Sequence, residues 1–337
     1  MAVWVVRAGR SGEHEDLALE KGFAVIGWSE LGDLSKVKSQ ERLRELCKEA
    51  YPDAKTNTIK TWAAQLWNFI GRIQIGELVV LPLKTRSAIA VGEVKGEYKY
   101  RPDLPERAQH TREVHWLRDD IPRSAFDQDL LYSFGAYLTV GRVRREKAEE
   151  RIRAVLEGRK PSVPEVPGEE PEEEAEVPRD LEEFTRDQVM TYIGQNFRGH
   201  ELSRLVTSLL EAQGYQTKMS TPGADGGVDI IAGRGPMGFD NPKLCVQVKS
   251  SDDPVGVKVL RELQGVMKNF GAEQGLLVAW GGFKKSVTTE VGRLFFEIRL
   301  WDSGDLVDVL LENYERLPED LKAELPLKRI WTLVPEE

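Results

Sequence analysis

Cysteine is scarce in this sequence, and long apolar runs are missing. The 337 residues include two cysteines, Cys47 and Cys245, without CxxC spacing, which excludes a disulfide scaffold and a cysteine-rich zinc site. No stretch approaches the roughly 20 apolar residues that cross a bilayer. The N-terminus has no basic segment leading into an apolar one, as a signal peptide would. The sequence therefore predicts a protein of the reducing cytoplasm with no membrane partner.

The acidic charge is concentrated in one short segment. The chain carries 47 Lys and Arg against 56 Asp and Glu, for a net charge of −9. Residues 161–178 contribute seven glutamates and five prolines with no basic residue, whereas residues 1–160 hold 28 basic against 24 acidic residues. Because the acidic segment need not face a ligand, the acidic total does not exclude a nucleic-acid partner.

Residues 161–178 also mark a domain boundary. Their prolines and like charges keep a chain extended and solvated, and they offer little apolar surface to bury. We therefore predict a linker between a first domain, residues 1–160, and a second domain, residues 179–337. The alternative is an acidic segment that mimics DNA and docks on a basic surface of the same protein.

Residues 1–160 alternate short strand-like runs with glycine-punctuated turns. A helix is expected at 58–72, where Ile59, Trp62 and Leu66 follow helical spacing. Further helices are expected at 13–21 and 40–51, and strands at 3–7, 24–28, 78–83, 88–98, 115–117 and 136–143. Short strands with inserted helices predict a small, strongly bent β-barrel.

Residues 179–337 follow a regular order of helices and strands. Helices are expected at 181–197, 200–213, 257–269, 285–296 and 305–314. Strands are expected at 215–220, 228–232, 243–249, 274–280 and 298–301. This order predicts an α/β domain whose mixed sheet is flanked by helices on both faces.

Four polar residues of the second domain form the candidate catalytic site. Asp229 lies within an apolar strand, where an ionised carboxylate is costly unless it meets a cation or a strong donor. Gln247 and Lys249 are two residues apart on the next strand, so their side chains share one face. Glu201, near the start of a helix, can complete the cluster from the side. Together these groups offer hard oxygen ligands to a divalent metal and an amine to a phosphate.

Three segments containing these residues resemble the Mrr-like branch of the PD-(D/E)XK nuclease superfamily. They are GHELSRLVTSLLEAQGY at 199–215, ADGGVDIIA at 224–232 and VQVK at 246–249, and the region 255–275 is similar as well. The resemblance covers about residues 185–312. It implies a nuclease fold in which Asp229, Glu201 and Gln247 bind Mg²⁺ or Mn²⁺ and Lys249 is catalytic. This chain departs from the family at Ser250-Ser251-Asp252-Asp253, where a basic or aromatic residue usually follows the lysine.

The first domain resembles a nucleic-acid-binding module of the PUA/EVE type. The matching segments are GELVVLP at 76–82, IAVGEV at 89–94, GEYKY at 96–100 and HTREVHW at 110–116, within residues 1–150. The resemblance implies nucleic-acid binding, in some modules with a flipped modified base held in an aromatic pocket. Modules of this type often bind RNA, so an RNA substrate stays open.

Five of the eight tryptophans lie in this first domain, and stacking on aromatic rings is how proteins hold an unstacked base. The pocket candidates are Trp28, Tyr98 and Trp116 because each lies at a strand end or beside a polar segment. Candidate phosphate contacts on strand-connecting turns are Arg7, Arg10, Lys84 and Arg86. The alternative is that the aromatic residues are ordinary core and that the cations are ordinary loop residues.

The combined interpretation is a modification-dependent, type IV-like restriction endonuclease that hydrolyses DNA with a divalent metal. Its partner would be modified double-stranded DNA, and the protein would act as a homodimer or a higher homo-oligomer. Two other functions stay open: a structure-selective repair nuclease or junction resolvase, and a DNA-binding adaptor that does not cleave.

Overall fold

The computed structural model describes residues 1–159, 180–220 and 227–331, so the predicted linker at 161–178 lies outside the described residues. The chain divides into two compact units, the first running through Phe184 and the second from Thr185 to Thr332. No described helix is long and apolar enough to cross a membrane.

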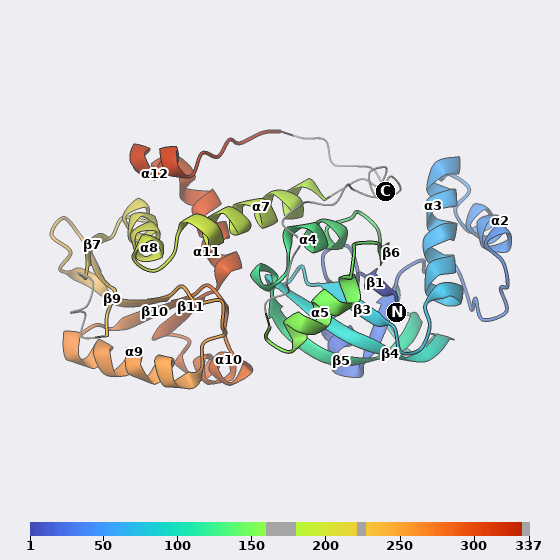
Figure 1. Cartoon of the computed structure of the whole chain (residues 1–337), viewed down its shortest axis with the longest axis horizontal. Helices are drawn as coiled ribbons and strands as arrows, with labels where there is room; N and C mark the ends of the chain where they lie inside the picture. The colour runs from blue at the N-terminus through green and yellow to red at the C-terminus, as the bar shows by residue number, and fades with distance from the viewer. Residues whose placement is uncertain (160–179, 221–226, 332–337) are drawn as a thin grey trace. The chain divides into compact units, whose positions relative to one another are not determined.

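The first unit is a six-stranded mixed sheet with helices on both faces (Figure 1). Its strands are β1 (Val3–Val6), β2 (Phe23–Ile26), β3 (Leu78–Pro82), β4 (Ala88–Tyr100), β5 (His110–Pro122) and β6 (Val140–Val143). Its helices are α1 (Glu15–Lys21), α2 (Gln40–Ala50), α3 (Thr56–Trp67), a π-helix (Asn68–Arg72), a 3₁₀ turn (Arg123–Ala125), α4 (Gln128–Phe134) and α5 (Ala148–Leu156).

The strand order β2-β5-β4-β3-β1-β6 leaves this sheet open. Strand β1 runs parallel to β3, and the other pairs are antiparallel. The expected barrel is not closed, because no hydrogen-bonded ladder within residues 1–159 joins the end strands β2 and β6. The first unit is therefore a bent open sheet in its described residues, and the predicted small, strongly bent barrel is not found there as a closed one.

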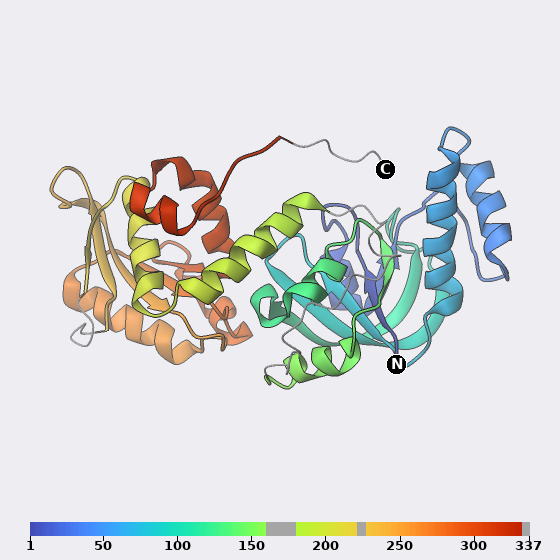
Figure 2. The same cartoon turned by 45° about the horizontal axis from the view of Figure 1, so that its top comes forward.

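Alternation along β1 shows how each face of this sheet is covered. Val3 and Val5 pack with α4 and α5, whereas Trp4 and Val6 pack with α2 and α3 on the other face. Helices α2 and α3 lie side by side in both views (Figures 1 and 2). Helices α4 and α5 were not expected from the sequence. They cover the sheet face that would line the interior of a barrel.

The second unit is a five-stranded mixed sheet between helices, as predicted. Its strands are β7 (Gln216–Met219), β8 (Ile230–Arg234), β9 (Asp240–Lys249), β10 (Gln274–Ala279) and β11 (Ile298–Trp301), in the order β11-β10-β9-β8-β7. Its helices are α7 (Leu181–Asn196, whose first residues belong to the first unit), α8 (His200–Ala212), α9 (Val257–Phe270), α10 (Lys285–Val291), α11 (Ser303–Asn313) and α12 (Glu319–Glu324), with 3₁₀ turns at Gly292–Leu294 and Tyr314–Arg316.

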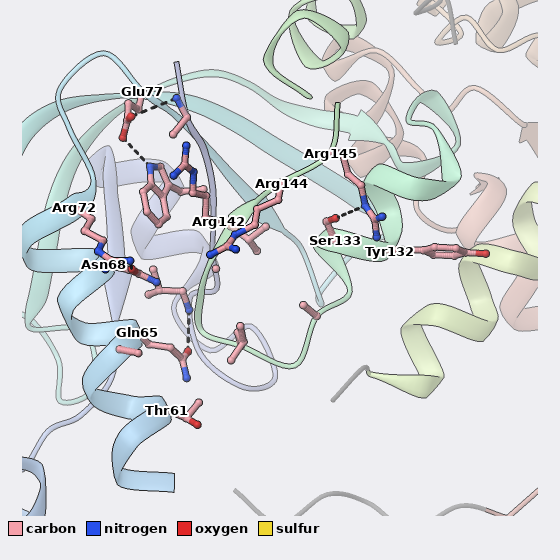
Figure 3. Close-up of a pocket in the computed structure, with 18 of the residues that line it drawn as sticks. Thr61, Gln65, Asn68, Arg72, Glu77, Tyr132, Ser133, Arg142, Arg144 and Arg145 are labelled. Carbon is pink, nitrogen blue, oxygen red and sulfur yellow. Dashed lines mark hydrogen bonds between the residues drawn. The ribbon is translucent and has the colours of Figure 1, made fainter. Parts of the chain in front are cut away.

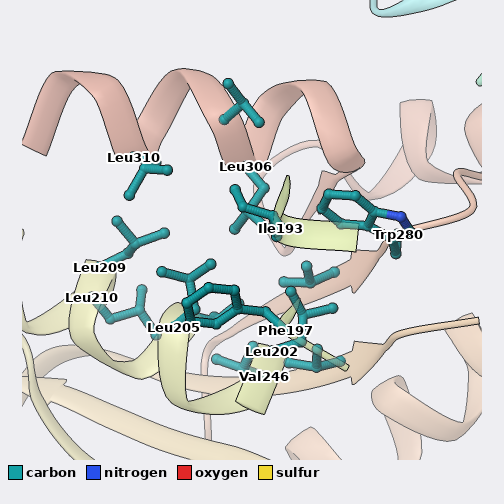
Figure 4. Packing of buried hydrophobic residues seen from close by; sticks show 14 of the residues in the cluster. Ile193, Phe197, Leu202, Leu205, Leu209, Leu210, Val246, Trp280, Leu306 and Leu310 are labelled. Carbon is teal, nitrogen blue, oxygen red and sulfur yellow. The ribbon is translucent and has the colours of Figure 1, made fainter. Parts of the chain in front are cut away.

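Each face of the second sheet has its own core. Helices α7, α8 and α11 cover one face, where Phe197, Leu205 and Leu306 pack over Val246 of β9 (Figure 4). Helix α9 covers the other face, where Cys245 of β9 packs against Leu260 and Leu263. Because successive strand residues point to opposite faces, residues 245, 247 and 249 of β9 belong to the α9 side.

Candidate active site

The pairing of β8 with β9 brings Asp229 opposite Gln247. Ile230 pairs with Val246 in an antiparallel ladder, so the preceding Asp229 lies across from Gln247. The Asp229 amide donates to the Val246 carbonyl at 3.0 Å, and the Ser220 amide donates to the Asp229 carbonyl at 2.8 Å. The backbone of Asp229 is therefore held from both neighbouring strands.

The carboxylate of Asp229 turns towards β9. Its Oδ2 accepts a hydrogen bond of 2.6 Å from the Val248 amide, between the two predicted β9 site residues. An oxygen bonded in this way has a fixed direction, because backbone donors do not rotate away as side chains do. Asp229 is half-buried, so the carboxylate combines a rigid position with access from solvent.

Gln247 is the unusual member of the site. Its side chain is 4% exposed, and its Oε1 has no hydrogen-bond partner in the described part of the chain. A buried acceptor without a donor costs about 1–3 kcal/mol, so proteins seldom keep one without a use. Gln247 lines a cavity of about 540 Å³ together with Gly227 and Glu262 and Lys268 of α9. The unpartnered oxygen and the adjoining cavity make Gln247 a candidate ligand for a cation.

Lys249 is the last residue of β9. Its carbonyl accepts from the Trp280 amide at 2.8 Å, and it pairs with Ala279 of β10 in the parallel ladder. The residue is half-buried, and its ammonium forms no ion pair or hydrogen bond with any described residue. The amine is thus anchored through its backbone while its charge stays available for an anion.

The turn after Lys249 packs closely on the end of β10. The Gly281 amide donates to the Ser251 carbonyl at 3.0 Å. A Cβ built on Gly281 would lie 2.4 Å from the Asp252 carbonyl, so only glycine permits this approach. Asp252 also lies 3.6 Å from Arg198. The residues that replace the family's basic or aromatic position therefore help to hold the end of β9.

Glu201 makes no direct polar contact with the other three residues in the described part of the chain. It lies in the first turn of α8, and its carboxylate accepts from Nε of Arg204 at 2.8 Å. Arg204 in turn contacts Glu324 of α12. Glu201 is 49% exposed and makes no hydrogen bond or ion pair with Asp229, Gln247 or Lys249 among the described residues. The strand register groups Asp229, Gln247 and Lys249, while Glu201 has Arg204 as its partner.

The oxygen atoms of Asp229 and Gln247 supply part of the coordination that a hard divalent cation needs. Asp229 offers a carboxylate, and Gln247 offers an amide oxygen that no protein donor within the described ranges occupies. Oxygen ligands of this kind suit Mg²⁺ and Mn²⁺. Residues 1–159, 180–220 and 227–331 hold no cluster of three or more His, Cys, Asp or Glu side chains arranged for a metal. Water and substrate oxygens would therefore have to supply much of the coordination.

The predicted aromatic residues of the first unit have different environments. The Tyr98 ring stacks on His110 with centroids 5.9 Å apart, and its hydroxyl accepts from the Leu34 amide at 3.2 Å. Burial raises the pKa of Tyr98. Trp116 donates its indole N–H to the Ala18 carbonyl at 2.9 Å and packs on two core clusters. Both side chains therefore have structural partners.

Trp28 also packs on a core cluster, but it differs from the other two residues in its backbone conformation and its indole N–H. Its φ of 68° lies in the left-handed region, which is strained for a bulky side chain. The ring is half-buried, and its indole N–H has no hydrogen-bond partner in the described residues. Nε2 of His110 lies 3.3 Å from the Trp28 carbonyl, which holds the backbone in this conformation.

The four predicted phosphate contacts divide into two pairs. Arg7 and Lys84 surround buried Glu183 at 3.2 and 3.0 Å, so both have an internal carboxylate partner. Arg10 is exposed, and Arg86 is 46% exposed and lies 3.8 Å from Asp119. We carry only Arg10 and Arg86 into the proposed interface.

Comparisons with known proteins find one family match within each unit. Residues 195–310 match a family described as restriction endonuclease, and residues 4–132 match a family described as a domain of unknown function. No curated protein matches the chain.

Similar solved structures include the modification-dependent restriction endonuclease AspBHI, with 17% identity, TM-score 0.34, and coverage of 90% of this chain and 87% of that one. The restriction endonuclease MspJI in complex with a 27-mer oligonucleotide has 15% identity, TM-score 0.32, and coverage of 81% and 69%. A protein of unknown function has 18% identity, TM-score 0.29, and coverage of 37% and 78%. At these scores the likeness carries no conclusion of its own.

The family match spans α8 through most of α11 and includes all four predicted catalytic residues. Its description agrees with the resemblance found in the sequence. Residues 195–310 of this chain are a restriction endonuclease catalytic domain.

Proposed function

We propose that the protein is a modification-dependent DNA endonuclease whose second unit hydrolyses phosphodiester bonds at Asp229, Gln247 and Lys249. The observation that carries the proposal is the orphaned Oε1 of Gln247, across the ladder from Asp229 and two residues from Lys249. Such an arrangement is costly for folding and useful for holding an ion beside a phosphate.

Each residue has a distinct task in this proposal. Asp229 and Gln247 would hold a divalent cation, Mg²⁺ or Mn²⁺, which when bound supplies Lewis-acid stabilisation of the phosphate charge. The Val248 amide keeps the Asp229 carboxylate in place. The Lys249 ammonium would stabilise charge on the phosphoryl oxygen and orient the attacking water. Since Asp229, Gln247 and Lys249 form a single site and a duplex has two strands, we propose a homodimer or larger homo-oligomer.

Cleavage of matched plasmids tests this function. We expect the full chain with Mg²⁺ or Mn²⁺ to cut a plasmid that carries modified bases and to leave the unmodified plasmid intact. EDTA should abolish the cleavage, because removing the cation removes its stabilisation of the phosphate charge. Nicked and linear products on agarose gels provide the measurement.

Other outcomes of the plasmid experiment would favour the alternative functions. Equal cutting of both plasmids with preference for a branched substrate would indicate a structure-selective nuclease or junction resolvase. Binding of modified DNA without any cleavage would indicate an adaptor. Cleavage of RNA alone would contradict the assignment of the substrate.

We propose that the first unit supplies the selectivity and that Trp28 forms part of its base-binding wall. Trp28 combines a half-buried aromatic side chain with a backbone conformation seldom kept without a function. Exposed Arg10 and Arg86 would contact phosphates on the neighbouring turns.

Replacing Trp28 by glycine separates function from folding. Glycine accepts the left-handed conformation without strain, so loss of the ring is partly offset by about 1 kcal/mol of backbone relief. We expect Trp28→Gly to bind modified duplex about tenfold more weakly or worse, with unmodified binding nearly unchanged, because stacking contributes roughly 1–3 kcal/mol per base. Fluorescence anisotropy with both duplexes in EDTA measures this difference.

The control for this variant is Trp116→Ala. Trp116 packs on two core clusters, so its truncation should lower the melting temperature of the protein instead of its selectivity. If Trp28→Gly melts early and binds both duplexes equally weakly, Trp28 belongs to the core and the wall lies elsewhere.

A further inference from the structure

The first unit contains a cavity that has no role in the functions described so far. It measures about 640 Å³ and lies between the α3–π-helix segment on one side and β1, β6 and the residues after β6 on the other (Figure 3). Pockets of roughly 300–1,000 Å³ are typical of small-molecule sites. None of the predicted base or phosphate contacts lines it.

The walls of this cavity are strongly basic. Five cations line it against one carboxylate: Lys60, Arg72, Arg142, Arg144 and Arg145 against Glu77. Glu77 is already satisfied, because it accepts from the Trp4 indole at 2.7 Å and from the Gln74 and Ala2 amides at 2.9 and 3.3 Å. The residues that line the cavity therefore include more cations than carboxylates.

Three of the cations have no ionic partner within residues 1–159 and 180–184. Lys60, Arg72 and Arg142 form no ion pair with a described residue of the chain. Arg72 only approaches Oδ1 of Asn68 at 3.4 Å, and the Arg142 guanidinium lies 6.0 Å from the Trp4 ring. Arg72 and Arg142 come from opposite walls of the cavity (Figure 3). Like charges placed on facing walls repel each other, and an anion between them removes that cost.

Neutral donors stand beside these cations. Gln65 is 6% exposed, and its Oε1 is fixed by the Thr139 and Val140 amides at 2.7 and 3.1 Å. Its NH₂ group has no hydrogen-bond partner among the described residues, so two oriented donors remain. Asn68 opens the π-helix, a rare form that is frequent at functional sites. The lining thus provides hydrogen-bonding groups as well as charge.

We propose that this cavity binds a nucleoside phosphate, either free or as one unit of a DNA strand. Guanidinium groups pair with phosphate oxygens bidentately, and amide side chains can hydrogen-bond a base or sugar. The size of the cavity suits one nucleotide rather than a bare phosphate ion. The site is independent of the nuclease proposal, because every lining residue belongs to the first unit.

Binding measurements on the full chain test the site. In EDTA, calorimetric titration with ATP and with inorganic phosphate examines the free nucleotide, and anisotropy with a short labelled duplex examines the strand. We expect Arg142→Gln with Arg144→Gln to weaken the binding probe by about tenfold or more, since a charged hydrogen bond contributes roughly 1.5–3 kcal/mol. The matched control, Arg42→Gln with Arg44→Gln on α2, removes two exposed charges of the same unit outside the cavity.

Each result either supports or overturns the site. Arginine-dependent binding of ATP identifies a free nucleotide, and arginine-dependent binding of duplex alone identifies a strand. Failure of every probe to bind at low salt, equal weakening by the two double variants, or binding of inorganic phosphate as tight as ATP overturns the proposal. Should the cavity double variant not fold, Arg72→Gln on the opposite wall replaces it with the same expected loss.

Discussion

Replacing Asp229 by asparagine or Lys249 by alanine is expected to slow DNA cleavage by about a hundredfold or more. Positioned electrostatic groups are each worth several kcal/mol in a transition state. Asparagine keeps an acceptor for the Val248 amide, so Asp229→Asn removes charge without removing the bond that holds the strand end. Lys249 has no ionic partner among the described residues, so its truncation breaks no ion pair there. Both variants should therefore fold normally.

The measurement is the initial cleavage rate with saturating metal, beside a thermal melt of each variant. Lys243→Ala, an exposed lysine of the same strand, is the matched control and should cleave normally.

Gln247→Met sharpens the test. It should lose cleavage while raising stability by about 1–3 kcal/mol, because an unsatisfied buried oxygen is replaced by an apolar group of similar size. Near-normal cleavage by Asp229→Asn would remove the assignment.

The second unit was predictable because its signals are local. The helix spacing, the buried strands and the QxK alternation each fix an element or a face, and together they are enough to place Asp229, Gln247 and Lys249 at one site. The contacts of Glu201 were not predicted from the sequence. Its pairing with Arg204 is local to α8, but the contact of Arg204 with Glu324 depends on α12, which lies more than a hundred residues away and gave no strong periodic signal.

The fold of the first unit was harder to predict, because it depends on how strands that are far apart in the sequence pair with one another. Strand β5 runs from His110 to Pro122, but the short apolar signal predicted only residues 115–117 of it. Register shifts along the β4–β5 ladder bend the sheet, and bulges leave no clear sequence signature. Whether β2 and β6 join is a property of the whole sheet. The basic cavity had a visible sign, the run Arg142, Arg144 and Arg145, but its facing wall comes from Arg72, far away in sequence.

Loss of the Glu183 carboxylate is expected to cost the first unit about 3–5 kcal/mol of unfolding free energy, because breaking a buried charge cluster leaves cations without a counterion. Glu183 is 9% exposed and lies within 3.2 Å of three cations, Arg7, Lys84 and Arg123. The penalty therefore exceeds that of a surface pair. Glu183→Ala in urea denaturation, followed by fluorescence, measures the effect. Glu182→Gln, one residue away and exposed, should be nearly neutral.

The same cluster predicts the pH dependence of stability. Burial alone would raise the pKa of Glu183, but Arg123, Arg7 and Lys84 outweigh it and lower the pKa to about 2 from the ordinary 4.5. A carboxyl whose pKa is lower in the folded state than in the unfolded state contributes its full stabilisation when the pH is above the unfolded-state pKa. This contribution to the free energy of unfolding is lost as the pH falls towards the folded-state pKa. The difference between the original protein and Glu183→Ala should therefore be constant above about pH 5 and shrink between about pH 4.5 and 2. A difference that stays constant down to pH 2 would mean that the cations do not act on Glu183, because an uncharged contact does not titrate.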